Sequence, residues 1–145
     1  MSRRSKSTLF LIEQLIVVAV FAICAAACVR ILTASYFMAT EANDMSNAVR
    51  VAESGAESYK AVSGDMAKTA EILEGNSVII DGEAGVIVYY DNDWRVCGEA
   101  DAYYVLRLVS LSDTSGPQSL LSGELSVGKL SGEEIIAFPV AARGG

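Results

Sequence analysis

The chain has 145 residues, of which 52% are hydrophobic, and it carries a formal net charge of −7 at pH 7. This length allows one compact domain with a segment outside it, since single domains commonly contain roughly 100–150 residues. No histidine occurs, which removes the commonest general base and zinc ligand and excludes Ser-His-Asp and Cys-His sites. Because the sequence also lacks a Gly-rich phosphate loop, we expect no enzyme, no cofactor and no metal site.

Charge is unevenly distributed along the chain. The basic residues Arg3, Arg4 and Lys6 lie among the first eight residues, which contain no acid. From Ile31 onward, 17 acidic residues face seven Lys or Arg residues, a net charge of −10. Such an acidic region argues against nucleic acid or an anionic lipid surface as a partner, because like charges repel.

An apolar run then predicts a membrane helix. The 24 residues from Leu9 to Leu32, LFLIEQLIVVAVFAICAAACVRIL, include only Glu13, Gln14 and Arg30 as clearly polar residues. As a helix this run is ~36 Å long and can cross ~30 Å of hydrocarbon, with the terminal arginine reaching the interface. Basic residues stay on the cytoplasmic side. We therefore expect a cytoplasmic leader at 1–8, a single span at 9–32 and the remaining chain outside the cell membrane.

A cleaved secretory signal peptide is the alternative interpretation. The basic start, the apolar stretch and the small residues at 25–27 are all compatible with cleavage near residue 27, and a lipoprotein would use Cys28. Glu13 and Gln14, however, interrupt the run where a signal peptide is most hydrophobic. A secreted or lipid-anchored binding domain, released by this cleavage, is accordingly the second choice of function.

The three cysteines favour packing over covalent or metal chemistry. Cys24 and Cys28 are four residues apart on one helical face, where they fit small-residue packing with Ala25 and Ala27. Cys97 is the lone cysteine of the outer region, so it cannot form a disulfide within that region.

Past the span, an apolar stripe predicts that the same helix continues over 33–62. Polar residues occupy the positions between, as in an amphipathic helix. Gly55 costs about 1 kcal/mol relative to Ala but does not break the pattern. We expect this stripe to lie on a β-sheet, and its members are Met38, Ala42, Met45, Val49, Ala52, Ala56 and Tyr59.

The remaining residues, 63–145, predict a head domain that is mostly sheet. Asp65 is a plausible N-cap for a short helix to about Leu73, closed by Gly75. Alternating patterns then predict strands at 77–81 and 85–90, joined by DGEAG, and at 102–111, 120–127 and 134–140, with a Gly-Pro loop, SDTSGPQS, after the third. Pro139 indicates an edge strand. The expected fold class is α+β, a long helix packed on an antiparallel sheet.

Two further clusters in the head have ordinary explanations. The acidic loop lacks the EF-hand order of calcium ligands, so solvated turn residues explain it better: Asp91, Asn92, Asp93, Glu99 and Asp101. The aromatic residues have strand spacing and are expected in the core or in cross-strand pairs: Tyr89, Tyr90, Trp94, Tyr103 and Tyr104.

The segment from Ser7 to Leu15, STLFLIEQL, is similar to the G-F-T-L-I-E-L segment of the type IV pilin and pseudopilin superfamily. Thr8 stands where that family keeps glycine, and the S-x-L-F-L-I-E form resembles small pilin-like proteins of Gram-positive bacteria. The resemblance implies a long helix with a β-sheet head and a structural role in a type IV pilus or a type II secretion-like assembly. It also implies cleavage between Thr8 and Leu9 by a prepilin peptidase.

The same resemblance implies a role for Glu13. In assembled pili this glutamate offsets the N-terminal amine of a neighbouring subunit and sets the axial register. The implied partners are other pilin-like subunits, the inner-membrane assembly platform and the prepilin peptidase. If the leader stays attached, Glu13 pairs with a basic residue or another protein, becomes protonated, is recognised by the platform, or stays hydrated near the interface.

Overall fold

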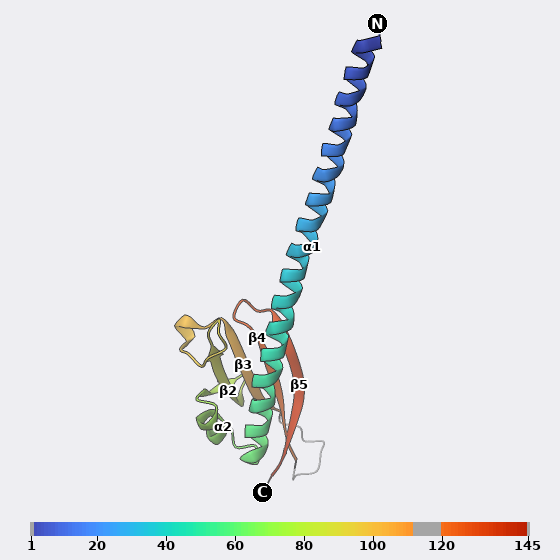
Figure 1. Ribbon diagram of the computed structural model, residues 1–145. Helices are drawn as coiled ribbons and strands as arrows, with labels where there is room; N and C mark the ends of the chain where they lie inside the picture. The colour runs from blue at the N-terminus through green and yellow to red at the C-terminus, as the bar shows by residue number, and fades with distance from the viewer. Residues whose placement is uncertain (1, 112–119, 145) are drawn as a thin grey trace. The chain divides into compact units, whose positions relative to one another are not determined.

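The computed structural model describes residues 2–111 and 120–144, with only the backbone for residues 2–4. The predicted loop at 112–119 lies outside the described residues. The chain divides into two compact units, Met1–Ala42 and Asn43–Gly145, which are considered separately below. The elements in chain order (Figure 1) are α1 (Ser2–Ala61), α2 (Met66–Ile72), β1 (Asn76–Ile80), β2 (Glu83–Tyr90), the 3-10 turn η1 (Glu99–Asp101), β3 (Tyr104–Leu111), β4 (Leu120–Lys129) and β5 (Glu134–Arg143).

Helix α1 begins at Ser2, so it includes residues of the predicted leader as well as the predicted span. No proline or glycine interrupts the leader, and helical geometry therefore continues through it. The helix ends at Ala61, where Ser63 and Gly64 adopt left-handed backbone angles, with φ of 53° and 82°. The Gly64 N–H donates to the Tyr59 carbonyl at 2.9 Å, which satisfies one of the carbonyls that the helix end leaves unpaired.

The strands that the structure describes form one antiparallel sheet in the order β1-β2-β3-β4-β5. The loop between β1 and β2 is only Asp81-Gly82, with φ of 52° and 88°, which is the conformation of a tight two-residue hairpin. The predicted five-residue loop DGEAG was therefore too long, because Glu83 already pairs with Ile80. Pro139 lies in the edge strand β5, as predicted, and an edge strand tolerates a residue without a backbone N–H because one of its sides forms no ladder.

Helix α2 begins at its predicted cap. The Asp65 Oδ1 atom accepts the N–H groups of Ala67 and Lys68 at 3.0 and 3.2 Å. At the other end Glu74, with φ of 55°, takes the left-handed position that was predicted for Gly75. The glycine has a different role, since a Cβ there would lie 2.6 Å from Val88 Cγ2 and 2.8 Å from the Ile87 carbonyl oxygen. It permits the close approach of α2 to β2.

Within the second unit, α1 covers the sheet with small residues. Its buried side chains are Ala48, Val51, Ala52, Ala56 and Tyr59. They share one core with residues of β2, β3 and β4, including Val86, Val88, Leu106, Leu108, Leu125 and Val127. At Gly55 an added Cβ would lie 2.9 Å from Leu125 Cδ1 and 3.2 Å from Leu106 Cδ1. The glycine therefore lets the helix backbone approach the sheet.

The predicted stripe was partly wrong. Ala52, Ala56 and Tyr59 are buried and Val49 is half-buried, whereas Met45 is 45% exposed. Met38 and Ala42, which belong to the first unit, are exposed. Close contact with the sheet favours the small residues Ala48 and Gly55. The buried face of the helix is therefore centred on these residues and not on the predicted stripe of larger side chains.

Candidate functional site

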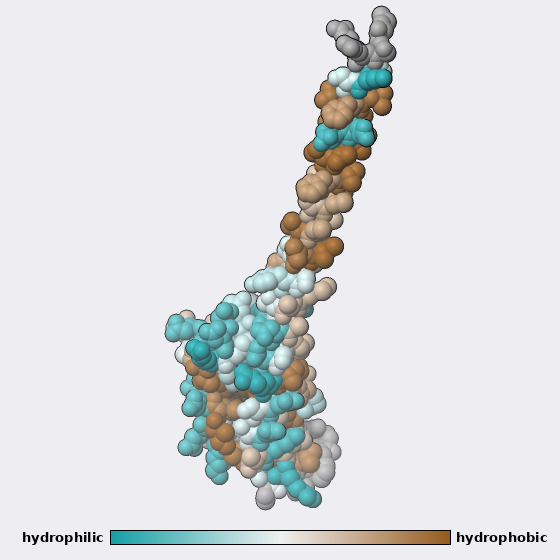
Figure 2. Space-filling model, viewed as in Figure 1, coloured by the Kyte–Doolittle hydropathy of each residue, from teal (hydrophilic) through white to brown (hydrophobic). Residues whose placement is uncertain are grey.

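The first unit presents an apolar helical surface. Every residue from 5 to 42 is exposed, and the large hydrophobic side chains between Leu9 and Met38 are 53% to 75% exposed. Figure 2 shows this stretch of α1 as brown, with a teal band near its N-terminal end. Soluble monomers rarely expose apolar patches larger than a few hundred Å². This helix is long and apolar enough to cross a membrane.

The predicted assembly and processing residues all lie on α1. Glu13 is exposed, and Leu9 precedes it by one helical turn, so the two side chains share a face. The Thr8–Leu9 bond lies inside the helix. Lys6 is exposed, while the side chains of Arg3 and Arg4 lie outside the described ones. Cys24 and Cys28 are both exposed and free.

In the second unit, the acidic loop after β2 is a turn that is held by hydrogen bonds within the loop itself. The Asp91 Oδ1 atom accepts the backbone N–H groups of Asp93 at 2.8 Å and Arg95 at 3.0 Å. Trp94 has φ of 60°, a conformation that is rare for a bulky residue. In the described part of the chain, no three Cys, Asp or Glu side chains gather as a metal-ligand set. The turn interpretation of this loop fits these contacts.

The aromatic residues mostly occupy the core, as predicted. Tyr90, Trp94 and Tyr104 are buried, Tyr89 is half-buried and Tyr103 is 49% exposed. The rings of Trp94 and Tyr104 stack with centroids 3.8 Å apart and planes 19° apart. Stacking and burial offset the backbone cost of the left-handed tryptophan, which is of order 1–3 kcal/mol.

A polar network ties α1 to the sheet within this unit. The Tyr104 hydroxyl donates to Asp44 Oδ1 at 2.7 Å, and Lys129 Nζ lies 4.0 Å from Asp44 Oδ2 and 3.0 Å from Glu133 Oε2. Burial, followed by the hydrogen bond to Asp44, raises the pKa of Tyr104 well above its usual value. The hydrogen bond to Glu133 raises the pKa of Lys129. Sequence reasoning missed this network, since its members are distant along the chain.

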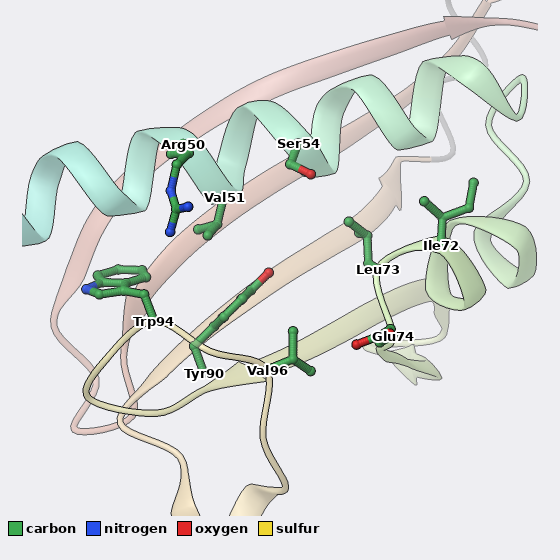
Figure 3. A pocket seen from close by; sticks show the side chains of 9 residues that line it. All are labelled: Arg50, Val51, Ser54, Ile72, Leu73, Glu74, Tyr90, Trp94 and Val96. Carbon is green, nitrogen blue, oxygen red and sulfur yellow. The ribbon is translucent and has the colours of Figure 1, made fainter.

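Sequence reasoning also missed a groove of about 350 Å³ between α1, the end of α2 and the loop after β2 (Figure 3). Burial raises the pKa of Tyr90, and the positive charge of Arg50 partly offsets that effect. Among the described residues, no hydrogen bond or ion pair engages the side chains of Arg50, Ser54, Tyr90 or Glu74. The lining residues are Arg50, Val51, Ser54, Ile72, Leu73, Glu74, Tyr90, Trp94 and Val96.

Comparison with known proteins gives no relative for this chain: no family model, no curated protein and no solved structure matches it. Function must therefore be inferred from the residues. Two features of the described residues are candidates for a functional site. They are the exposed apolar part of α1, with Glu13 near its start, and the groove of the second unit.

Proposed function

We propose that this chain is a non-catalytic structural subunit, a minor pilin or pseudopilin of a type IV pilus or type II secretion-like assembly. The observation that carries the proposal is the exposed apolar segment of α1, which has one carboxylate, Glu13, within its first turns. The later part of the same helix lies on an antiparallel sheet, an α+β arrangement consistent with a pilin-like subunit.

The apolar segment requires an apolar environment on all sides. A helix that is hydrophobic all round is stable in lipid or among other helices, and not in water. We propose that it spans the cell membrane once, with the basic residues Arg3, Arg4 and Lys6 in the cytoplasm and the acidic head outside. In the assembled state, neighbouring pilin-like helices take the place of lipid.

Glu13 gives this association its specificity. An ionised carboxylate costs ~2.5–3.5 kcal/mol at mid-bilayer even on the scale that gives the smallest values, and Glu13, near the start of the proposed span, bears part of that cost. A partner of opposite charge in the neighbouring subunit offsets that cost. The N-terminal amine of a subunit that begins at Leu9 is such a partner. The proposed partners are thus other pilin-like subunits, the inner-membrane assembly platform and a prepilin peptidase.

The assembly role of Glu13 is tested by pull-down of co-expressed pilin-like subunits from membranes. We expect Glu13→Ala and Glu13→Gln to reduce association by about tenfold or more, which corresponds to ~1.4 kcal/mol. Gln14→Ala, at the adjacent polar position, is the matched control and should leave association unchanged. Wild-type association of the Glu13→Gln variant would refute the role of the charge.

Processing is tested by the intact mass of the native protein. A chain that begins at Leu9 supports cleavage by a prepilin peptidase. Retention of residues 1–8 contradicts that cleavage, and Glu13 must then pair with another group. A chain that begins at Cys28 or Val29 supports the alternative, a secreted or lipid-anchored binding domain.

A further inference from the structure

The apolar surface of the first unit carries two opposite charges. Between Lys6 and Glu41, the charged residues are Glu13 and Arg30, and both are exposed. Among the described residues, no hydrogen bond or ion pair engages either side chain. The two lie 17 residues apart on one helix, a rise of ~26 Å, so they cannot pair with each other. In apolar surroundings each charge therefore needs a partner from another molecule.

The two charges lie among side chains of different size. On an α-helix, residues three and four positions away share a face. The side chains that flank Arg30 in this way are small, whereas those that flank Glu13 are large. Large side chains of one helix pack well against small side chains of another. The two faces are thus complementary in charge and in size, with Ala26, Ala27, Thr33 and Ala34 around Arg30 and Leu9, Phe10, Ile16 and Val17 around Glu13.

The exposed apolar surface also continues past the proposed span. A bilayer with ~30 Å of hydrocarbon covers about 20 helical residues. The stretch from Leu9 to Met38 contains 30 residues and is ~45 Å long as a helix. At its outer end Tyr36, Phe37 and Met38 are 66% to 72% exposed. Lipid cannot cover both ends of this stretch at once, but a neighbouring apolar helix that is displaced outward can cover the outer end.

We propose that Arg30 binds Glu13 of a second copy of this chain, whose helix is parallel and displaced outward by 17 residues, ~26 Å. In this register the large face of the second copy lies on the small face of the first. Its residues 14–21 cover residues 31–38 of the first copy. The proposal rests on the proposed function and identifies a neighbour of Glu13. It requires no cleavage, and an amine at Leu9 can bind the same carboxylate, which has two acceptor oxygens.

Subunits at equal depth in the membrane have a different register. There equal residues lie opposite each other, so Glu13 faces Glu13 and Arg30 faces Arg30, and like charges repel. Displacement replaces these contacts with a pair of opposite charge. Cross-links between equal positions therefore report subunits that are not displaced, whereas the displaced register brings together unequal positions.

Exchange of the two charges tests the pair. We would co-express two full-length copies with different tags, solubilise the membranes in mild detergent and purify through one tag. Two Glu13→Arg copies, or two Arg30→Glu copies, should associate at least about tenfold more weakly than wild type. A Glu13→Arg copy and an Arg30→Glu copy should regain association, because their exchanged charges are opposite. Lys60→Glu reverses an exposed cation of the second unit on the same helix and is the matched control, which should associate normally.

Disulfide cross-linking tests the register with both charges intact. Val20 follows Glu13 by seven residues and Phe37 follows Arg30 by seven, so both lie on the faces of the pair. With the three native cysteines replaced by serine, Val20→Cys on one copy should cross-link to Phe37→Cys on the other. Val20→Cys paired with Ala27→Cys reports a displacement of only seven residues, the register that would place Lys6 beside Glu13, and it should not cross-link.

Normal association of two Arg30→Glu copies, or no recovery in the exchanged pair, would overturn the inference. A cross-link from position 20 to 27 and none to 37 would do the same. Neither result would affect the proposed function if Glu13→Ala still reduces association with other pilin-like subunits. Absence of association between two wild-type copies would overturn the second copy as the partner, and the Glu13 pull-down would still test the assembly role independently.

Discussion

The Tyr104 hydroxyl donates a 2.7 Å hydrogen bond to the Asp44 carboxylate across a sequence separation of 60 residues. Asp44 lies on α1 and Tyr104 begins β3, so this bond joins the helix to the sheet within the second unit. Lys129, at the end of β4, lies 4.0 Å from the other oxygen of Asp44 and also contacts Glu133. The helix is therefore positioned by a polar contact as well as by its apolar face.

Removal of the Tyr104 hydroxyl should destabilise the head. Hydrogen bonds to charged groups contribute about 1.5–3 kcal/mol, and Asp44 would lose its shortest contact. We expect Tyr104→Phe to lower the free energy of unfolding by about 1–3 kcal/mol, measured by denaturant titration of near-UV circular dichroism. Tyr103→Phe, at the exposed neighbouring tyrosine, should have almost no effect. Equal stability of the two variants would contradict a stabilising role for the bond.

Alkaline pH should weaken the same contact. Burial and the bond to Asp44 raise the pKa of Tyr104 above its ordinary 10.0, so the folded state keeps a proton that the unfolded chain loses. This stabilisation is complete below about pH 10 and declines as pH rises further. Denaturant titrations at pH 8, 10 and 11 should show the decline, and Tyr104→Phe should reduce it. An identical pH dependence in the variant would exclude Tyr104 as its source.

The close approach at Gly55 should limit which side chains fit there. Alanine gains up to about 1 kcal/mol of helix propensity, but its Cβ would lie 2.9 Å from Leu125 Cδ1. Because that atom ends a flexible side chain, we expect Gly55→Ala to be near neutral. Gly55→Leu should cost about 1–3 kcal/mol through overpacking. Glu57→Leu, on the exposed side of the helix, is the control. Thermal unfolding compares the stability of the three variants. An unchanged Tm for Gly55→Leu would contradict close packing of the helix on the sheet at this position.

If the apolar segments of neighbouring subunits pack together, their cysteines should cross-link. Cys24 and Cys28 are free and exposed on α1, whereas Cys97 is half-buried in the second unit. We expect oxidant treatment of native membranes to give disulfide-linked dimers with variants that keep only Cys24 or only Cys28. A variant that keeps only Cys97 should stay monomeric on non-reducing gels. Dimers from the Cys97 variant alone would contradict helix-mediated assembly.

Local chemistry made much of this protein predictable. The apolar run, the Asp65 cap and the alternating strands depend on residues that are close in sequence. The strands pair in the order in which they occur in the chain, and Pro139 indicated that the last strand lies at an edge. Glu13 stands out for the same reason, because its apolar neighbours make a carboxylate costly.

Only the tertiary structure decided what depends on distant residues. The buried face of α1 is centred on Ala48 and Gly55 because the side chains of Leu106 and Leu125 occupy the space opposite. The groove combines Arg50, Glu74 and Trp94 from three separate segments, and no local pattern marks them as neighbours. Periodicity shows that a face is apolar, but the surface that packs against it determines which of its residues are buried.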